Sequence, residues 1–272
     1  MQHELAEKID ASDLLIIGIG KEWDWVRMGI RSDPRYDQFI EYCNLEGNQF
    51  LFPVLEYEYA LYNPDPKIED AYKGLKKLVG DKKCFIISEN FLQDACLYGF
   101  KPEFLVNPCG NYRFLQSSND QEELWEAKEI PEFMELVERI HKIITELNGN
   151  LGNDSSFSQI FFNGKELYLN QKRQEYSKIK YNENSYKKNW DEYMKYLSDT
   201  LNKKLLILEL GVSLDYPTVI RWPFEKVTFI NKNAHLIRVH EKLFHHTPEI
   251  SEKTESIQMN SVDYILQESN GL

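Results

Sequence analysis

Two glycines follow the first strongly apolar segment of the chain and are candidates for binding chemistry. Residues 14–17 lead directly into Gly18-Ile19-Gly20. Because glycine has no Cβ, backbone amides there can approach a pyrophosphate closely. A third glycine does not follow at the spacing of the dinucleotide-binding motif, since Lys21-Glu22-Trp23-Asp24 comes next. The pair therefore indicates either a phosphate-binding loop or an ordinary turn after a strand.

Small or polar residues also follow four later apolar segments. Ligands of parallel α/β sheets bind outside the carboxyl ends of the strands, so residues just after strands are candidates for a binding site. These candidates are Asn90, after residues 84–88; Cys109 and Gly110, after residues 104–106; Gly211, Val212 and Ser213, after residues 205–210; and His240, after residues 236–239.

Cys109 is a candidate base or nucleophile, but only as a thiolate. The reference pKa of cysteine is about 8.5, so little of the thiol is ionised at pH 7 unless a neighbour lowers that pKa. A histidine partner could do so, and the candidates are His235, His240, His245 and His246. We favour the alternative, an inert small residue at position 109. The adjacent pair His245-His246 lacks helical ligand spacing and indicates a surface loop rather than a metal site.

The elements that would position these residues alternate between strands and helices. Apolar runs without polar alternation are typical of strands buried on both faces of a parallel sheet. The expected strands are residues 14–17, 84–88, 104–106, 205–210, 227–230 and 236–239, with a hairpin at 161–169 around Asn163-Gly164. The expected helices are residues 2–12, 67–79, 91–97, 130–147, 190–201, 218–221 and 261–266. This alternation predicts an α/β fold with a doubly wound, Rossmann-type parallel sheet.

The length of 272 residues suits one large domain that carries a smaller insert. We expect residues 1–110 and 189–272 to form the Rossmann-like domain and residues 111–188 to form a small inserted module. The formal net charge of −12 argues against broad binding of nucleic acid or of an anionic membrane, because both need a positive surface. No apolar run approaches the ~20 residues that span a bilayer. The polar start of the chain and four cysteines without a C-x-x-C pair indicate the cytoplasm.

The order and spacing of several motifs resemble the sirtuin family, over about residues 10–268. The motifs are Gly18-Ile19-Gly20, Ser88-Glu89-Asn90-Phe91-Leu92, Asn107-Pro108-Cys109-Gly110, and Leu208-Glu209-Leu210-Gly211-Val212-Ser213 with Pro223-Phe224 downstream. The stretch 205–224 matches best, and the similarity is greatest to the class linked to macrodomains in microbes. The resemblance implies a sirtuin-like (DHS-like) parallel sheet with NAD as its ligand, and makes residues 1–110 and 189–272 the NAD-binding domain.

The resemblance also implies roles for the candidate residues. Gly18 and Gly20 match the first phosphate loop, and Asn90 matches an asparagine near the nicotinamide ribose. Gly211, Val212 and Ser213 match the loop that meets the NAD phosphates, Gly110 matches the glycine after the catalytic base, and His240 falls near an asparagine that contacts the adenosine ribose.

Several positions depart from the family pattern. Leu92 falls where an aspartate holds the nicotinamide amide, and losing that acceptor should weaken binding by ~1–3 kcal/mol. Cys109 falls where the family has a histidine or glutamine. Lys21-Glu22-Trp23-Asp24-Trp25 replaces small residues, and we expect it to fill part of the cofactor pocket, the alternative being to stack on a different ligand.

The zinc module of the family also departs from its pattern. Its two cysteine pairs would fall near Gln116-Ser117-Ser118-Asn119 and Phe162-Asn163-Gly164, where there is no cysteine. We therefore expect no zinc and no other metal. Instead, aromatic and apolar packing should hold the small module, through Phe157, Phe161, Phe162, Leu167 and Tyr168.

Two functional hypotheses follow from these residues. The first is a degenerate, sirtuin-like module with impaired catalysis that binds NAD or ADP-ribose, with a protein as a further partner. The second is an active NAD-dependent deacylase or ADP-ribosyltransferase, in which Asn90 orients the ribose and Cys109 stands in weakly for the base. Neither hypothesis names the acceptor.

Overall fold

The computed structural model describes residues 4–92, 94–118, 123–152, 156–173 and 179–270, and its strands form two separate sheets. The chain divides into two compact units, each containing one sheet. The first unit combines Met1–Asp24, Asp65–Cys109 and Tyr186–Leu272, and the second combines Trp25–Pro64 and Gly110–Ser185. Residues 25–64 therefore group with the expected insert, whereas their sequence had placed them within the expected Rossmann-like domain.

The first sheet contains six strands, and every neighbouring pair is parallel. Strands of its centre are buried on both faces, which explains their unbroken apolar sequences. The order across the sheet is β10 (Thr254–Ile257), β9 (Ala234–Val239), β8 (Leu205–Leu210), β1 (Leu14–Ile19), β2 (Cys84–Ser88) and β3 (Leu105–Val106). The predicted α/β fold with a Rossmann-type parallel sheet is confirmed.

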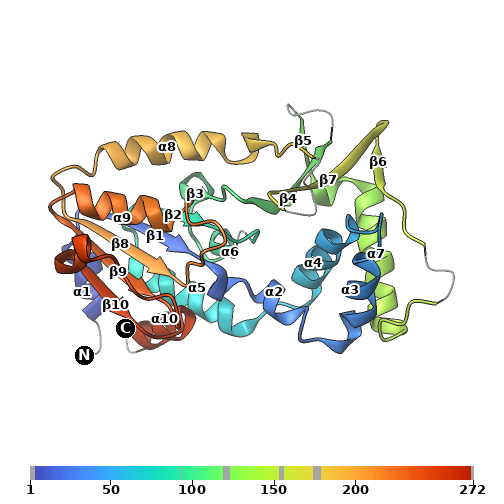
Figure 1. The fold of residues 1–272 in the computed structure, drawn as a ribbon, viewed down its shortest axis with the longest axis horizontal. Helices are drawn as coiled ribbons and strands as arrows, with labels where there is room; N and C mark the ends of the chain where they lie inside the picture. Colours follow the sequence, from blue (N-terminus) through green and yellow to red (C-terminus); the bar gives the residue numbers. More distant parts are fainter. Residues whose placement is uncertain (1–3, 93, 119–122, 153–155, 174–178, 271–272) are drawn as a thin grey trace. The chain divides into compact units, whose positions relative to one another are not determined.

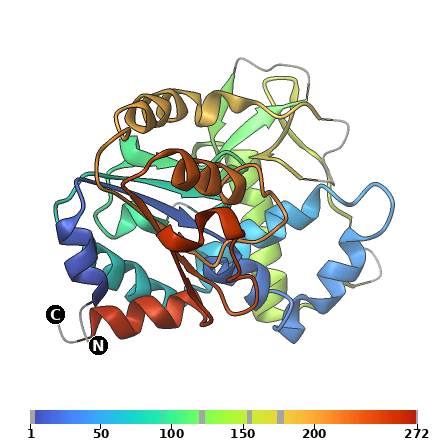
Figure 2. The same ribbon diagram turned by 60° about the vertical axis from the view of Figure 1, so that its left-hand side comes forward.

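Helices cover both faces of this sheet (Figures 1 and 2). One face is covered by α1 (Glu4–Ala11), α5 (Pro66–Val79) and α10 (Ser261–Ser269), and the other by α8 (Lys187–Ser198) and α9 (Arg221–Ile230). Asp65 caps α5, whose first residue is Pro66, and the Asn260 side chain accepts hydrogen bonds from the first amides of α10. The short helix α6 (Asp94–Leu97) follows β2.

The strand order contains a topological switch point between β1 and β8. From β1 the chain builds outward through β2 and β3, and then returns to the other side of β1 to build β8, β9 and β10. Ile19 of β1 lies opposite Leu210 of β8, so the loops that follow these two strands start side by side. In open α/β sheets a crevice at such a point is where ligands bind.

The second unit is built on an antiparallel sheet with the order β5 (Leu124–Glu126), β4 (Gly110–Ser117), β7 (Lys165–Gln171) and β6 (Ile160–Phe162). Asn163 and Gly164 have φ angles of 50° and 75°, and they form the predicted hairpin turn. The helices of this unit are α2 (Trp25–Gly29), α3 (Asp37–Cys43), α4 (Leu51–Tyr62) and α7 (Pro131–Glu146). On α4, Tyr57 packs edge to face on Phe133 of α7, which explains why residues 25–64 belong here.

Four local expectations were wrong. The helix expected at residues 218–221 is not formed there, since residues 217–220 form a turn and α9 begins at Arg221. Residues 227–230 are helical and not a strand, because they continue α9, in which Phe224 and Thr228 are buried four residues apart while Phe229 is exposed. The side chain of Phe161 is 56% exposed, so it does not help to pack the small module, whereas Phe157 and Leu167 are buried. The helix expected at residues 91–97 is limited to the four residues of α6.

Candidate functional site

The two glycine loops meet at the switch point through direct backbone packing. Gly20 donates a backbone hydrogen bond to Leu210 O at 2.9 Å. A Cβ on Gly20 would lie 2.2 Å from Val212 Cα and 2.4 Å from Gly211 O, so no other residue fits without moving the backbone. Gly211 has a φ of +64°, which also favours glycine. The structure therefore brings Gly20, Gly211 and Val212 together at one end of the sheet, and their contacts with a nucleotide remain a prediction.

Gly18 has a different environment from its partner in the motif. A Cβ there would lie 2.5 Å from Ile220 Cγ2 and 2.7 Å from Phe224 Cε2. Gly18 thus allows close packing of α9 and its preceding turn on the sheet. Its predicted contact with a phosphate remains a prediction.

A buried carboxylate lies between the two loops. Glu89 follows β2, its backbone amide donates to Ile19 O at 3.1 Å, and the residue is only 5% exposed. Its Oε1 atom accepts hydrogen bonds from the backbone amides of Lys21 at 3.2 Å and Ser213 at 2.8 Å. One amide comes from each glycine loop, so both loops direct a donor at the same anionic oxygen.

Glu89 was not among the site residues predicted from the sequence. The available signal was a charged residue directly after a strand that is buried along its whole length. Burial raises the pKa of Glu89 to about 7, and the charge of Asp215 acts in the same direction. The amides of Ser213 and Lys21 and the Ser213 hydroxyl oppose the shift. Its Oε2 atom has no hydrogen-bond partner within the part of the chain that the structure describes.

A second carboxylate, that of Glu22, binds further amides at this end of the sheet. Glu22 Oε2 accepts from Ser261 N, the first amide of α10, at 2.7 Å. Glu22 Oε1 accepts from Glu241 N at 2.9 Å. An anion at a helix N-terminus is stabilised by the helix dipole, so Glu22 contributes to the stability of α10.

His240 follows β9 and is held by the turn that comes after it. Its Nδ1 atom accepts from the backbone amides of Lys242 at 3.0 Å and Leu243 at 3.1 Å, which requires the neutral ring. Burial lowers the pKa of His240, although Glu22, 3.1 Å from Nδ1, opposes that shift. The predicted ribose contact would therefore have to be made by another atom than Nδ1.

Asn90 connects the end of β2 to the first glycine loop. Its side-chain amide donates to Gly20 O at 3.0 Å, and the residue is 3% exposed. Its own carbonyl accepts from Asn107 Nδ2 at 3.0 Å. These bonds give Asn90 a bracing role, and Leu92 nearby in sequence is half-buried.

Trp23 is fully buried in the first unit. Its Nε1 donates to Ser261 Oγ at 3.0 Å, and its ring packs edge to face on Tyr72 of α5 with centroids 4.8 Å apart. The ring thus fills space beside α5 and α10 and satisfies its own polar atom. Trp25, by contrast, belongs to the second unit.

Cys109 and Gly110 lie where the chain passes between the units. Cys109 is completely buried. Gly110 has a φ of +100°, and a Cβ there would lie 2.2 Å from Asn170 O, which accounts for the glycine within the second sheet. The histidines considered as partners for Cys109 have other contacts: His235 with Glu255, His240 with Glu22, His245 stacked on Phe244, and His246 with Ser256.

The glutamate of the Leu-Glu-x-Gly motif belongs to a buried ion-pair network. Glu209 of β8 binds Arg238 of β9 through two bonds, of 2.7 and 2.9 Å, and both side chains are inaccessible or nearly so. Arg221 at the start of α9 lies 3.4 Å from the same carboxylate. Breaking an ion pair that is buried this well strongly destabilises a protein. The network therefore holds β8, β9 and α9 in register.

Buried amides occupy the region where the zinc cysteines of the family would fall. Gln116 Oε1 accepts from Asn182 N at 2.9 Å, and its Nε2 donates to Lys180 O at 3.0 Å. Gln116 also receives a bond from Asn170 Nδ2. The described residues contain no group of three or more His, Cys, Asp or Glu placed to hold a metal. Asn119, part of the predicted first region, lies outside the described residues.

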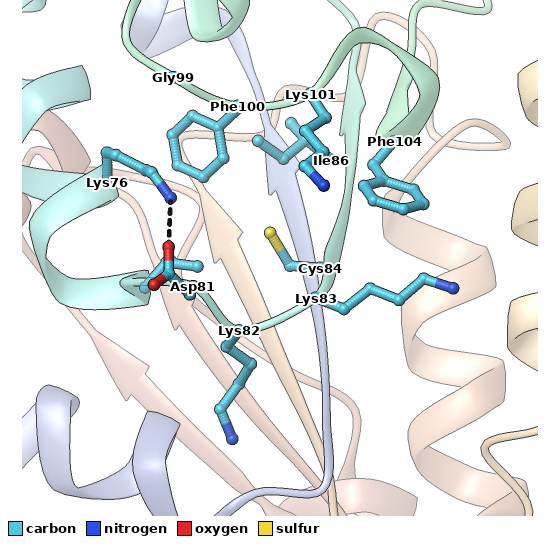
Figure 3. A pocket seen from close by; sticks show the side chains of 11 residues that line it. Lys76, Asp81, Lys82, Lys83, Cys84, Ile86, Gly99, Phe100, Lys101 and Phe104 are labelled. Atoms are coloured by element: carbon cyan, nitrogen blue, oxygen red, sulfur yellow. Dashed lines mark ion pairs between the residues drawn. The ribbon is translucent and has the colours of Figure 1, made fainter.

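A separate basic pocket of about 440 Å³ lies at the opposite, amino end of β2 (Figure 3). Its charged and aromatic lining is Lys76, Asp81, Lys82, Lys83, Lys101, Phe100 and Phe104, with Cys84. Lys82 and Lys83 point away from Cys84, since Lys82 binds Ser12 O and Lys83 lies over the Phe104 and Tyr196 rings. Lys76 binds Gly80 O at the end of α5. We therefore place the candidate site at the switch point.

No family model matches the chain, and no curated protein matches it. Solved structures do. A Sir2 homologue in complex with ADP-ribose matches with a TM-score of 0.58 and 14% identity, covering 99% of this chain and 95% of the other. A Sir2 homologue–NAD complex matches with a TM-score of 0.55 and 13% identity, covering 99% of this chain and 93% of the other. A Sir2–p53 peptide–NAD+ structure matches with a TM-score of 0.52 and 16% identity, covering 97% of this chain and 96% of the other. The chain thus has a sirtuin-like α/β fold, with an inserted module that lacks zinc cysteines. No helix in the described ranges is long and apolar enough to cross a membrane.

Proposed function

We propose that this protein is a degenerate sirtuin-like module that binds NAD or ADP-ribose at the β1–β8 switch point and has impaired catalysis. One observation supports the binding site above all: the amides of Lys21 and Ser213, one from each glycine loop, converge on a single anionic oxygen. Converging backbone amides are the usual means of holding a nucleotide phosphate in such folds. Two structures with the same fold contain NAD or ADP-ribose.

Impaired catalysis is supported by how the candidate catalytic residues are used. The Asn90 side chain is 3% exposed and donates to Gly20 O, so only its second N–H and its Oδ1 atom are left to orient a ribose. Leu92 provides no carboxylate for a nicotinamide amide. Cys109 is fully buried, so its thiol does not reach the protein surface as a base or nucleophile would have to.

The competing hypothesis is an active NAD-dependent protein deacylase or ADP-ribosyltransferase of the sirtuin family. It predicts turnover and an acceptor. A Sir2 structure of the same fold contains a p53 peptide, so a peptide is the kind of protein partner to test.

Calorimetric titration with NAD and with ADP-ribose, in parallel, tests the proposal. We expect ADP-ribose to bind, and we expect no release of nicotinamide from NAD above background. Asn90→Ala provides the comparison for turnover. Asn189→Ala is its matched control, because Asn189 also donates to backbone carbonyls of the first unit, those of Pro102 and Leu105.

Two results would contradict the proposal. Absence of heat with both ligands would mean that only the scaffold is retained. Release of nicotinamide that Asn90→Ala abolishes and Asn189→Ala preserves would establish the enzyme instead.

A further inference from the structure

The proposed nucleotide site contains an anion that belongs to the protein itself. We propose that the Glu89 carboxylate substitutes internally for a nucleotide phosphate oxygen, so that a diphosphate binds only by displacing it, with uptake of a proton. The inference rests on the proposed function, because it concerns regulation of the same site. It makes nucleotide binding dependent on pH.

The geometry shows why the carboxylate and a phosphate compete. Glu89 Oε1 already accepts the amides of Lys21 and Ser213, the donors that a phosphate would need. Two anions that share one pair of donors would lie within hydrogen-bond range of each other in a water-poor environment, where their repulsion is large. A phosphate can therefore take these amides only when Glu89 releases them, and a Glu89 carboxyl that stays beside the diphosphate must then be neutral.

Burial and the charge of Asp215 favour the neutral form of Glu89, whereas the positive charge of Arg221 favours the ionised form. Asp215, which follows Ser213 in the β8 loop, raises the pKa of Glu89 further. The Lys21 ammonium is engaged by Asp215 at 3.0 Å, and Arg221 of α9 is close enough to interact with Glu89. Because burial already brings the pKa of Glu89 to about 7, protonation near neutral pH costs little free energy. A diphosphate nearby would raise that pKa further, and this couples ligand binding to proton uptake.

The experiment compares ADP-ribose binding by the wild-type chain and by Glu89→Gln at pH 6 and pH 8. The diphosphate of ADP-ribose does not titrate in this range, so a change in affinity reports the protein. If only the neutral Glu89 carboxyl releases the two amides, its pKa near 7 predicts that the wild type binds ADP-ribose about tenfold more weakly at pH 8 than at pH 6. The Glu89→Gln chain should bind with similar affinity at both pH values, and more tightly than the wild type at pH 8.

Proton uptake provides a second measurement that needs no variant. Titrations of the wild type at pH 8 in two buffers with different ionisation enthalpies should give different apparent heats, because the protein takes a proton from the buffer. Glu89→Gln should show no such difference. Glu192→Gln, which removes one exposed carboxylate from α8, is the matched charge control and should behave as the wild type.

The outcomes separate the two proposals. If wild type and Glu89→Gln bind ADP-ribose equally at both pH values without proton uptake, the Glu89 inference is overturned and the nucleotide site stands. If neither chain binds at either pH, the proposed function fails. A third result would place the anion site in the basic pocket and overturn the inference. In that case Lys101→Ala would lose ADP-ribose binding, and Glu89→Gln would bind ADP-ribose as the wild type does.

Discussion

Glu89 shows how one residue changes the chemistry of a phosphate-binding geometry. The amides of Lys21 and Ser213 are arranged as they would be for a phosphate, but they hold a side-chain oxygen. A carboxyl group that is 5% exposed, with one oxygen lacking a partner among the described residues, is costly to ionise. The same residue therefore links folding stability to pH, and under our proposal it links nucleotide binding to pH as well.

At this scale we predict that Glu89→Gln removes a pH dependence of stability. The pKa of Glu89 is about 7 in the folded protein and near its ordinary value of 4.5 when unfolded, so the native state holds the proton between these pH values. The contribution of Glu89 to the free energy of unfolding should therefore be largest below pH 4.5. It should fall by about 3 kcal/mol in total as the pH rises through 7. Urea unfolding of wild type and variant between pH 5 and 8 measures this; parallel curves would contradict the assignment.

The loops after β1 and β8 are the elements that define the switch point. Gly20 lies against the backbone of Gly211 and Val212, so these two loops are in contact without side chains between them. The Glu209–Arg238 network fixes β8 to β9 behind them. The position of the converging amides thus depends on rigid strands and on a backbone contact that only glycine permits.

At this scale we predict that Gly20→Ala destabilises the protein by about 1–3 kcal/mol, because its Cβ would overlap backbone atoms that cannot rotate away. Gly152→Ala is the control. A Cβ there would meet nothing within 4 Å, and its φ lies outside the left-handed region, so the change should stay within about 0.5 kcal/mol. Chemical unfolding of both variants measures the difference, and equal stabilities would show that the loops are not in tight contact.

The whole molecule carries a large negative charge, with 44 acidic and 32 basic residues. Self-repulsion of this charge opposes the folded state and is screened by salt. Exposed ion pairs contribute little to the free energy of unfolding, and salt screens the buried Glu209–Arg238 pair only weakly. Neither kind of pair should therefore reverse the stabilising effect of salt.

At this scale we predict that the thermal midpoint rises by a few degrees as sodium chloride increases from about 20 to 300 mM. Reversing two exposed charges on α7, Glu135→Lys with Glu138→Lys, changes the net charge from −12 to −8 and should reduce the salt dependence. A midpoint that falls with salt would show that attractive pairs dominate instead.

Local patterns predicted most of the first sheet because its strands are buried on both faces, and burial leaves a continuous apolar sequence. The strand predicted at residues 227–230 was wrong because Val, Thr, Phe and Ile favour strands, whereas here Thr228 is buried as the helical neighbour of Phe224. The edge strand β10 was missed, since its four residues are only half-buried and show no apolar run. Short segments are decided by their neighbours more than by their own composition.

The sequence by itself determined the parallel sheet, the helix–strand alternation and the positions of the glycines, because these follow from apolar periodicity and from backbone freedom. Only the tertiary structure decided what those glycine loops hold. Glu89 is separated from Lys21 by 68 residues and from Ser213 by 124. They meet because β2 and β8 lie on either side of β1, and that neighbourhood is a property of sheet topology that no local stretch of sequence contains.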